Sequence, residues 1–197
     1  MKTSATTKPE LSIMLFERPK DWATWLDKHQ ATSPGLWLRL AKKAASIQSI
    51  TYAEALDIAL CYGWIDGHKK AYDADSWLQK FTPRRPKSIW SQINTAKAEQ
   101  LIANGQMKPA GLKAIEQAQQ DGRWAAAYAS QSKAEVPEDL QAELDQRPKA
   151  AAFFASLNST NRYAILFRLH TAKKAETRAK RLAQFVAMLE KGEKIHS

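Results

Sequence analysis

The chain has 197 residues, a net charge of +10, and 44% hydrophobic residues that include seven tryptophans. This content of apolar and aromatic residues excludes a chain that is disordered throughout, and the length predicts one domain or one domain with a helical extension. Seven glycines and only two valines disfavour a β-sandwich or a large parallel sheet, whereas the abundant alanine favours helices. The single cysteine excludes an intrachain disulfide and a cysteine-based zinc site.

The N-terminal half predicts short strands mixed with helices. Residues 36–40 form a short apolar run after a turn, which is typical of a strand. Thr51 and Glu54 have the spacing of a capping box, in which two side chains satisfy free N–H groups at a helix start. Residues 64–82 favour short strands, with Asp66-Gly67 as a turn dipeptide.

The C-terminal half predicts helical hairpins. The sequence therefore favours an α+β, predominantly helical fold, with a small β-sheet region in the N-terminal half followed by a C-terminal helical part. We expect a flexible N-terminal segment at 1–13, an α+β region at 14–131 that holds a Trp/Arg motif, and a helical region at 132–197 packed on it as one compact unit.

Tryptophans and cations gather between residues 63 and 94. Pro83 and Pro86 keep Arg84 and Arg85 out of a helix, and Ser88 is expected to start a helix whose free N–H groups attract anions. Guanidinium groups beside indole rings are the chemistry of an anion-binding or base-stacking pocket. The candidate ligand-binding residues are Trp64, Asp66, His68, Arg84, Arg85, Lys87, Trp90, Asn94, Arg123 and Trp124.

A structural interpretation of the same residues stays open. The tryptophans then form core, and Arg84 or Arg85 ties the loop to Asp66 or Asp75.

The evidence for catalysis is weaker than the evidence for binding. Asp66 and His68 could act as a general base and its helper, but Asp-Gly is more typical of a turn. Cys61 on an apolar helix is more typical of a buried side chain than of a nucleophile. We assign no catalytic residue, and we expect no metal and no cofactor, because the histidines lack ligand spacing and no phosphate-binding glycine motif is present.

Two basic regions, at 76–98 and 162–181, suggest nucleic acid as an alternative partner. A solvated basic face is the more usual explanation of the second region.

Several motifs in a fixed order resemble one family. They are Tyr52-Ala-Glu-Ala-Leu, Ala59-Leu-Cys-Tyr-Gly-Trp-Ile-Asp-Gly67, Phe81-Thr-Pro-Arg-Arg-Pro-Lys-Ser88, Trp90-Ser91, Met107-Lys-Pro-Ala-Gly111, Asp121-Gly-Arg-Trp124, Val136-Pro-Glu-Asp-Leu140, Asn161-Arg-Tyr163, Thr177-Arg178 and Arg181. This set is similar to that of the YdeI/OmpD-associated family of bacterial proteins, from about Phe16 to His196.

The resemblance implies a role in stress or in protection against bacteriocins or cationic peptides. Its name also implies association with an outer-membrane porin. The sequence has no apolar run long enough for an export signal or a membrane span, so we expect a cytoplasmic protein. The leading hypothesis is a binding protein whose partner is an anionic small molecule or an acidic protein surface; the alternatives are a nucleic-acid-binding protein and a small enzyme with a pocket around Asp66.

Overall fold

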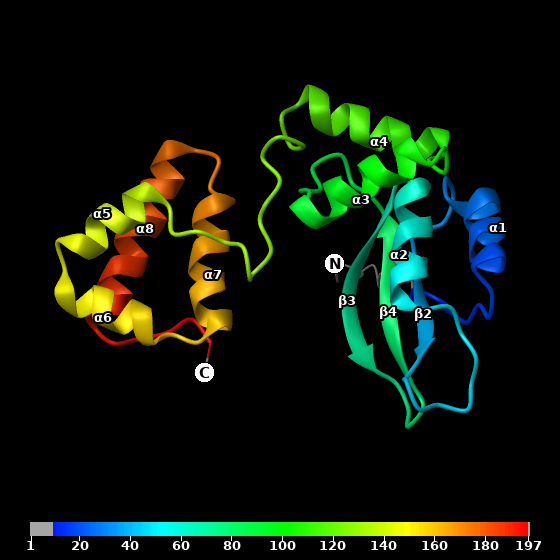
Figure 1. The fold of residues 1–197 in the computed structure, drawn as a ribbon, viewed down its shortest axis with the longest axis horizontal. Coiled ribbons are helices and arrows are strands. Elements are labelled where there is room, and N and C mark those ends of the chain that lie inside the picture. The colour runs from blue at the N-terminus through cyan, green and yellow to red at the C-terminus, as the bar shows by residue number, and fades with distance from the viewer. Residues whose placement is uncertain (1–9, 197) are drawn as a thin grey trace, which may run out of the picture. The chain divides into compact units, whose positions relative to one another are not determined.

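The computed structural model describes residues 10–196, which form two compact units. The first unit comprises residues 10–88 and 94–125, and the second comprises 89–93 and 126–196. Within the described residues there are eight helices and a four-stranded sheet (Figure 1). The predominantly helical α+β fold, with the sheet in the N-terminal half, is therefore confirmed.

The sheet belongs to the first unit and has the strand order β1-β2-β4-β3. Its strands are β1 (Ile13–Met14), β2 (Leu36–Ala41), β3 (Trp64–Ala71) and β4 (Ser76–Pro83). β1 runs parallel to β2, and the other two pairs are antiparallel. Most of the expected flexible segment at 1–13 lies outside the described residues, and Ile13 pairs with Trp37 at the sheet edge.

One face of the sheet is covered by α1 (Pro19–His29) and α2 (Tyr52–Cys61). The expected capping box starts α2, since Thr51 Oγ1 accepts from the Glu54 amide at 3.2 Å and Glu54 accepts from the Thr51 amide at 2.8 Å. Trp22 of α1 is fully buried and its indole donates to the Ala55 carbonyl at 3.1 Å, which joins the two helices. The core beneath them consists of Leu26, Leu36, Leu38, Leu40, Leu60, Trp64 and Phe81.

The turn expected at Asp66-Gly67 is wrong, because both residues lie inside β3. One extra residue bulges out of β3 between Asp66 and Lys69. The chain turns instead between β3 and β4, where the Asp73 carboxylate accepts from the Asp75 and Ser76 amides at 3.0 and 2.7 Å. The same carboxylate also accepts from Ser76 Oγ at 2.7 Å. These three hydrogen bonds to Asp73 place the turn here and not at Asp66-Gly67.

Two further helices complete the first unit, α3 (Gln92–Ala103), which begins in the 89–93 segment, and α4 (Pro109–Gln120). The helix expected at Ser88 begins at Gln92 instead, so no helix N-terminus adjoins the two arginines in sequence. Gly111 of α4 lies against the end of α2, where a side chain would overlap the Cys61 carbonyl oxygen.

The second unit contains α5 (Glu138–Asp145), α6 (Pro148–Ser156), α7 (Ser159–His170) and α8 (Ala175–Glu190). These helices enclose a core that includes Leu140, Phe154, Ile165, Leu169, Phe185 and Leu189. Asn158 caps α7, with its side chain accepting from the Asn161 amide at 2.9 Å.

Candidate functional site

Four of the ten predicted ligand-binding residues line two cavities on opposite faces of the sheet, Arg84 and Arg85 in one and Asp66 and His68 in the other. Lys80 and Phe81 are neighbours in β4 and therefore point to opposite faces. Arg84 and Arg85 line a cavity on the Lys80 face, which is the face away from α1 and α2. Asp66, the register partner of Phe81, lines a cavity on the α2 face.

We name the first one the arginine cavity; it has a volume of about 620 Å³. Its lining consists of Glu10, Leu11, Pro34, Trp37, Lys80, Thr82, Pro83, Arg84, Arg85 and Pro86. Three cations and one carboxylate give it a positive balance, and an indole and three prolines provide its apolar surface. Such a lining favours an anion that also carries an apolar or flat part.

The backbone of the Arg84–Ser88 loop is held by hydrogen bonds. The Arg84 amide donates to the Gly63 carbonyl at 2.9 Å, and the Arg85 amide donates to Ser88 Oγ at 3.0 Å. The Ser88 amide returns a bond to the Arg85 carbonyl at 2.9 Å, which closes a turn around Pro86. The Arg85 side chain remains exposed, so a rigid loop presents a solvent-accessible guanidinium.

Buried Arg123 supports the Arg84–Ser88 loop through a hydrogen bond. Its side chain is 7% exposed, and Nη1 donates to the Ser88 carbonyl at 2.8 Å. Nε donates to both carboxylate oxygens of Asp121, at 2.8 and 2.7 Å. Arg123 therefore positions the loop and is too buried to reach a ligand on the open surface.

Trp37 and Lys80 are lining residues that sequence patterns did not reveal. They are direct register partners in β2 and β4, so their side chains share one face. The ammonium of Lys70 on β3 lies 4.5 Å from the Trp37 ring centre, as a cation–π contact. The sequence offered one signal, Trp37 between Leu36 and Leu38 in a strand-like run. That Lys80 lies beside it depends on the register between distant strands, which the sequence does not show.

The second cavity, named the Asp66 cavity, has a volume of about 550 Å³. Its lining consists of Tyr52, Asp66, Gly67, His68, Lys69, Trp77 and Gln79. Tyr52 Oη donates to Asp66 Oδ2 at 2.8 Å, and buried Gln79 donates to the Gly67 carbonyl at 2.8 Å, which holds the β3 bulge. The concave surface at Asp66 that an enzyme would need is thus present, and Asp66 and His68 stay a catalytic hypothesis.

The remaining predicted residues have other positions. Trp64 is 1% exposed and donates from its indole to the Gln30 carbonyl at 3.2 Å, so it belongs to the core. Trp90 is 2% exposed and belongs to the second unit. Lys87 is exposed, Asn94 and Trp124 are half-buried, and none of the three is among the lining residues of either cavity.

The basic C-terminal helices use their arginines internally. Arg178 donates from Nε and Nη2 to the Asp139 carboxylate, at 2.6 and 2.8 Å, and from Nη1 to the Leu169 carbonyl at 2.9 Å. Arg181 donates to the Arg168 carbonyl at 2.5 Å. The Asp139 carboxylate offsets the charge of Arg178, whereas Arg181 keeps its charge and has one of its donors engaged.

Neither a reactive thiol nor a metal cluster is indicated. Burial and the nearby Asp57 raise the pKa of the Cys61 thiol, which keeps it protonated and weakly nucleophilic. Between residues 10 and 196, no group of three or more His, Cys, Asp and Glu residues could hold a metal ion. In the same part of the chain, no helix is long and apolar enough to cross a membrane.

These features define a protein with a small α+β sheet unit, a helical unit, and a cationic, aromatic cavity on the sheet face away from α1 and α2. Residues 14–114, just over half of the chain, match the family described as Domain of unknown function (DUF8412). The chain belongs to this family.

Residues 133–192 match the description Bacteriocin-protection, YdeI or OmpD-Associated. The resemblance expected from the sequence is therefore confirmed, by a match that covers the helical unit from α5 to α8. The quoted motifs from Tyr52 to Gly111 fall within the other family's match. No curated protein and no solved structure matches the chain.

Proposed function

We propose that this chain is an anion-binding protein with a role in stress or in protection against bacteriocins or cationic peptides, and that the arginine cavity is its binding site. The observation that carries the proposal is the exposed Arg85 on a hydrogen-bonded loop, beside Trp37 and Lys80 in one cavity. The protective role rests on the description of the family that residues 133–192 match.

The lining favours a phosphate or carboxylate group. A guanidinium forms two parallel hydrogen bonds to such a group, and a lysine adds a point charge. Because the Arg84–Ser88 backbone is already fixed, binding orders only the side-chain ends, which reduces its entropic cost. The Glu10 carboxylate in the lining disfavours ligands whose negative charge extends over the whole cavity.

Inorganic pyrophosphate is a suitable first probe, titrated by isothermal calorimetry at low salt. Arg85→Ala should weaken its binding by about 10- to 150-fold, since a charge-assisted hydrogen bond contributes about 1.5–3 kcal/mol. Lys113 is an exposed residue of α4 and does not line the cavity. Lys113→Ala also removes one positive charge and serves as the matched control. Equal binding by the wild type and Arg85→Ala would contradict the proposal.

The same variants separate the possible partners. A hexaglutamate peptide tests an acidic protein surface, and a single-stranded oligonucleotide tests nucleic acid. Oligonucleotide binding that falls steeply with salt, with pyrophosphate and hexaglutamate inactive, would favour the nucleic-acid alternative instead.

Two further expectations belong to the same proposal. The association with OmpD named in the family description would make a porin a partner of this chain, which a binding assay with the purified porin tests. The cytoplasmic location remains a prediction that cell fractionation tests.

A further inference from the structure

A third cavity adjoins the Asp66 cavity on the α2 face of the sheet. It has a volume of about 490 Å³ and is lined by Lys42, Lys69, Lys70, Ala71 and Trp77. Because Lys69 and Trp77 line both cavities, the two form one groove along β3, which we name the Trp77 groove. The arginine cavity shares no lining residue with it.

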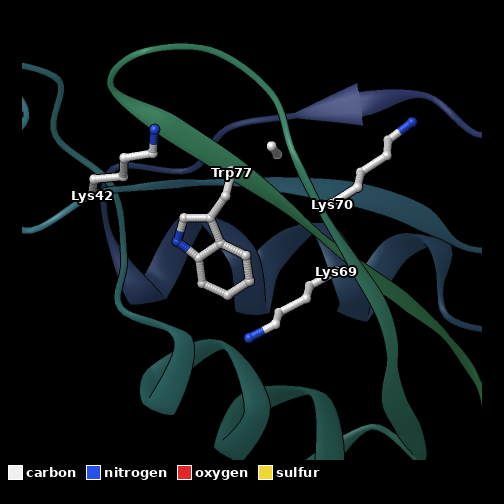
Figure 2. A pocket seen from close by; sticks show the side chains of 5 residues that line it. Lys42, Lys69, Lys70 and Trp77 are labelled. Carbon is white, nitrogen blue, oxygen red and sulfur yellow. The ribbon is translucent and has the colours of Figure 1, made fainter. Parts of the chain in front are cut away.

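One end of the groove carries a cation that is held in place, Lys42. Lys42 Nζ donates to the Asp73 and Ala74 carbonyls at 2.8 and 2.9 Å. An ammonium has three donors, so these two bonds hold the charge in place and leave a third N–H for a ligand. Figure 2 shows Lys42 and Lys69 on either side of the Trp77 indole, whereas Lys70 points away from it.

The middle of the groove is a flat aromatic surface. Trp77 is half-buried in β4, and its ring centre lies 6.2 Å from that of Tyr52. A half-buried indole exposes enough of its face for a planar ring to stack on it.

The other end of the groove is acidic and accepts hydrogen bonds. The Asp66 carboxylate lies here, with Oδ2 accepting from Tyr52 Oη at 2.8 Å. A carboxylate has about four lone-pair sites, so it accepts further N–H groups from a ligand. The groove therefore runs from the Lys42 ammonium, past the Trp77 indole, to the Asp66 carboxylate, with Lys69 on the Asp66 side of the indole.

We propose that the Trp77 groove binds a small molecule with a planar ring, an anionic group at one end and N–H donors at the other. A nucleoside monophosphate has this chemistry: its phosphate suits Lys42, its base suits Trp77, and an amino group on the base suits Asp66. This site is independent of the arginine cavity and requires no function of it.

Isothermal calorimetry of the full chain with AMP tests the groove, with adenosine and ribose 5-phosphate as probes that lack the anion or the ring. AMP should bind at least tenfold more tightly than either. Lys42→Ala changes an exposed side chain and should weaken AMP roughly tenfold, while leaving adenosine binding nearly unchanged. Lys20→Ala on α1 is the charge-matched control.

Trp77→Leu should remove the advantage of AMP over ribose 5-phosphate. Circular dichroism checks its fold, and the Lys42 comparison decides the matter if this variant unfolds. AMP that binds no more tightly than ribose 5-phosphate, or that weakens equally in Lys42→Ala and Lys20→Ala, would overturn the proposal.

Discussion

The ammonium of Lys70 lies 4.5 Å from the centre of the Trp37 ring, although the two residues are on strands that β4 separates. This contact crosses β4 on the sheet face away from α1 and α2, and it fixes the Trp37 indole that lines the arginine cavity. An ammonium over an indole is stabilising at an exposed site by about 0.5–1 kcal/mol.

Lys70→Ala should therefore lower the free energy of unfolding by about 0.5–1 kcal/mol, measured by urea denaturation. Lys113→Ala on α4 controls for the loss of a charge alone. Identical unfolding curves for the two variants would show that the Trp37 contact contributes nothing to stability.

The Asp139–Arg178 pair should make the stability of the helical unit depend on pH. Hydrogen bonds from the Arg178 guanidinium lower the pKa of the Asp139 carboxyl below its ordinary value of 3.8. A lowered folded-state pKa means that the stabilisation is complete above pH 3.8 and is lost as the pH falls through the folded-state value.

Asp139→Asn should accordingly cost about 1 kcal/mol at pH 7, since both side chains are about one-third exposed and solvent screens the pair. It should also reduce the loss of stability between pH 5 and pH 2, roughly the range over which such a group titrates. Thermal unfolding across that range measures both effects, and an unchanged acid limb would be the opposite result.

Gly111 should tolerate no side chain. An added Cβ would overlap the Cys61 carbonyl oxygen and Met107 Sδ, so Gly111→Ala should push α4 away from α2 and cost about 1–3 kcal/mol. Gly67→Ala is a matched control, because its Cβ would meet only the Lys80 side chain, at 3.7 Å or more. Similar melting temperatures for the two variants would contradict this packing.

Arg123 should affect the arginine cavity without contacting a ligand. Arg123→Lys keeps the charge but cannot donate to Asp121 and to the Ser88 carbonyl in the same geometry. Hydrogen exchange at the Arg85 and Ser88 amides should become faster, and pyrophosphate binding should weaken severalfold. Unchanged exchange together with unchanged binding would remove the positioning role.

The features that were predictable from the sequence depend on neighbouring residues. Thr51 and Glu54 form the capping box because both partners lie within one helical turn. The fold class followed in the same way, from helical spacing and short apolar runs.

The errors arose where distant residues decide the structure. Asp66-Gly67 is a common turn pair, but β4 holds it in a strand and the buried Gln79 amide stabilises the resulting bulge. Ser88 could cap a helix by type, yet its hydroxyl accepts from the Arg85 amide instead.

The candidate site was predictable only in part, for the same reason. The Pro83–Pro86 bracket around Arg84 and Arg85 was visible in the sequence, but the pairing of Trp37 with Lys80 depends on strand register. Asp66 and Arg85 are close in the sequence yet line cavities on opposite sheet faces, which sequence spacing cannot distinguish.

The anion site is tested most directly by a two-dimensional ¹H–¹⁵N NMR titration of the full chain with pyrophosphate. We expect saturable shifts of the Trp37 indole N–H and of the Thr82, Arg84 and Arg85 amides, and their absence in Arg85→Ala. Shifts spread evenly over the lysine-bearing surface, with the Trp37 and Arg85 signals unmoved, would show that the arginine cavity does not bind anions.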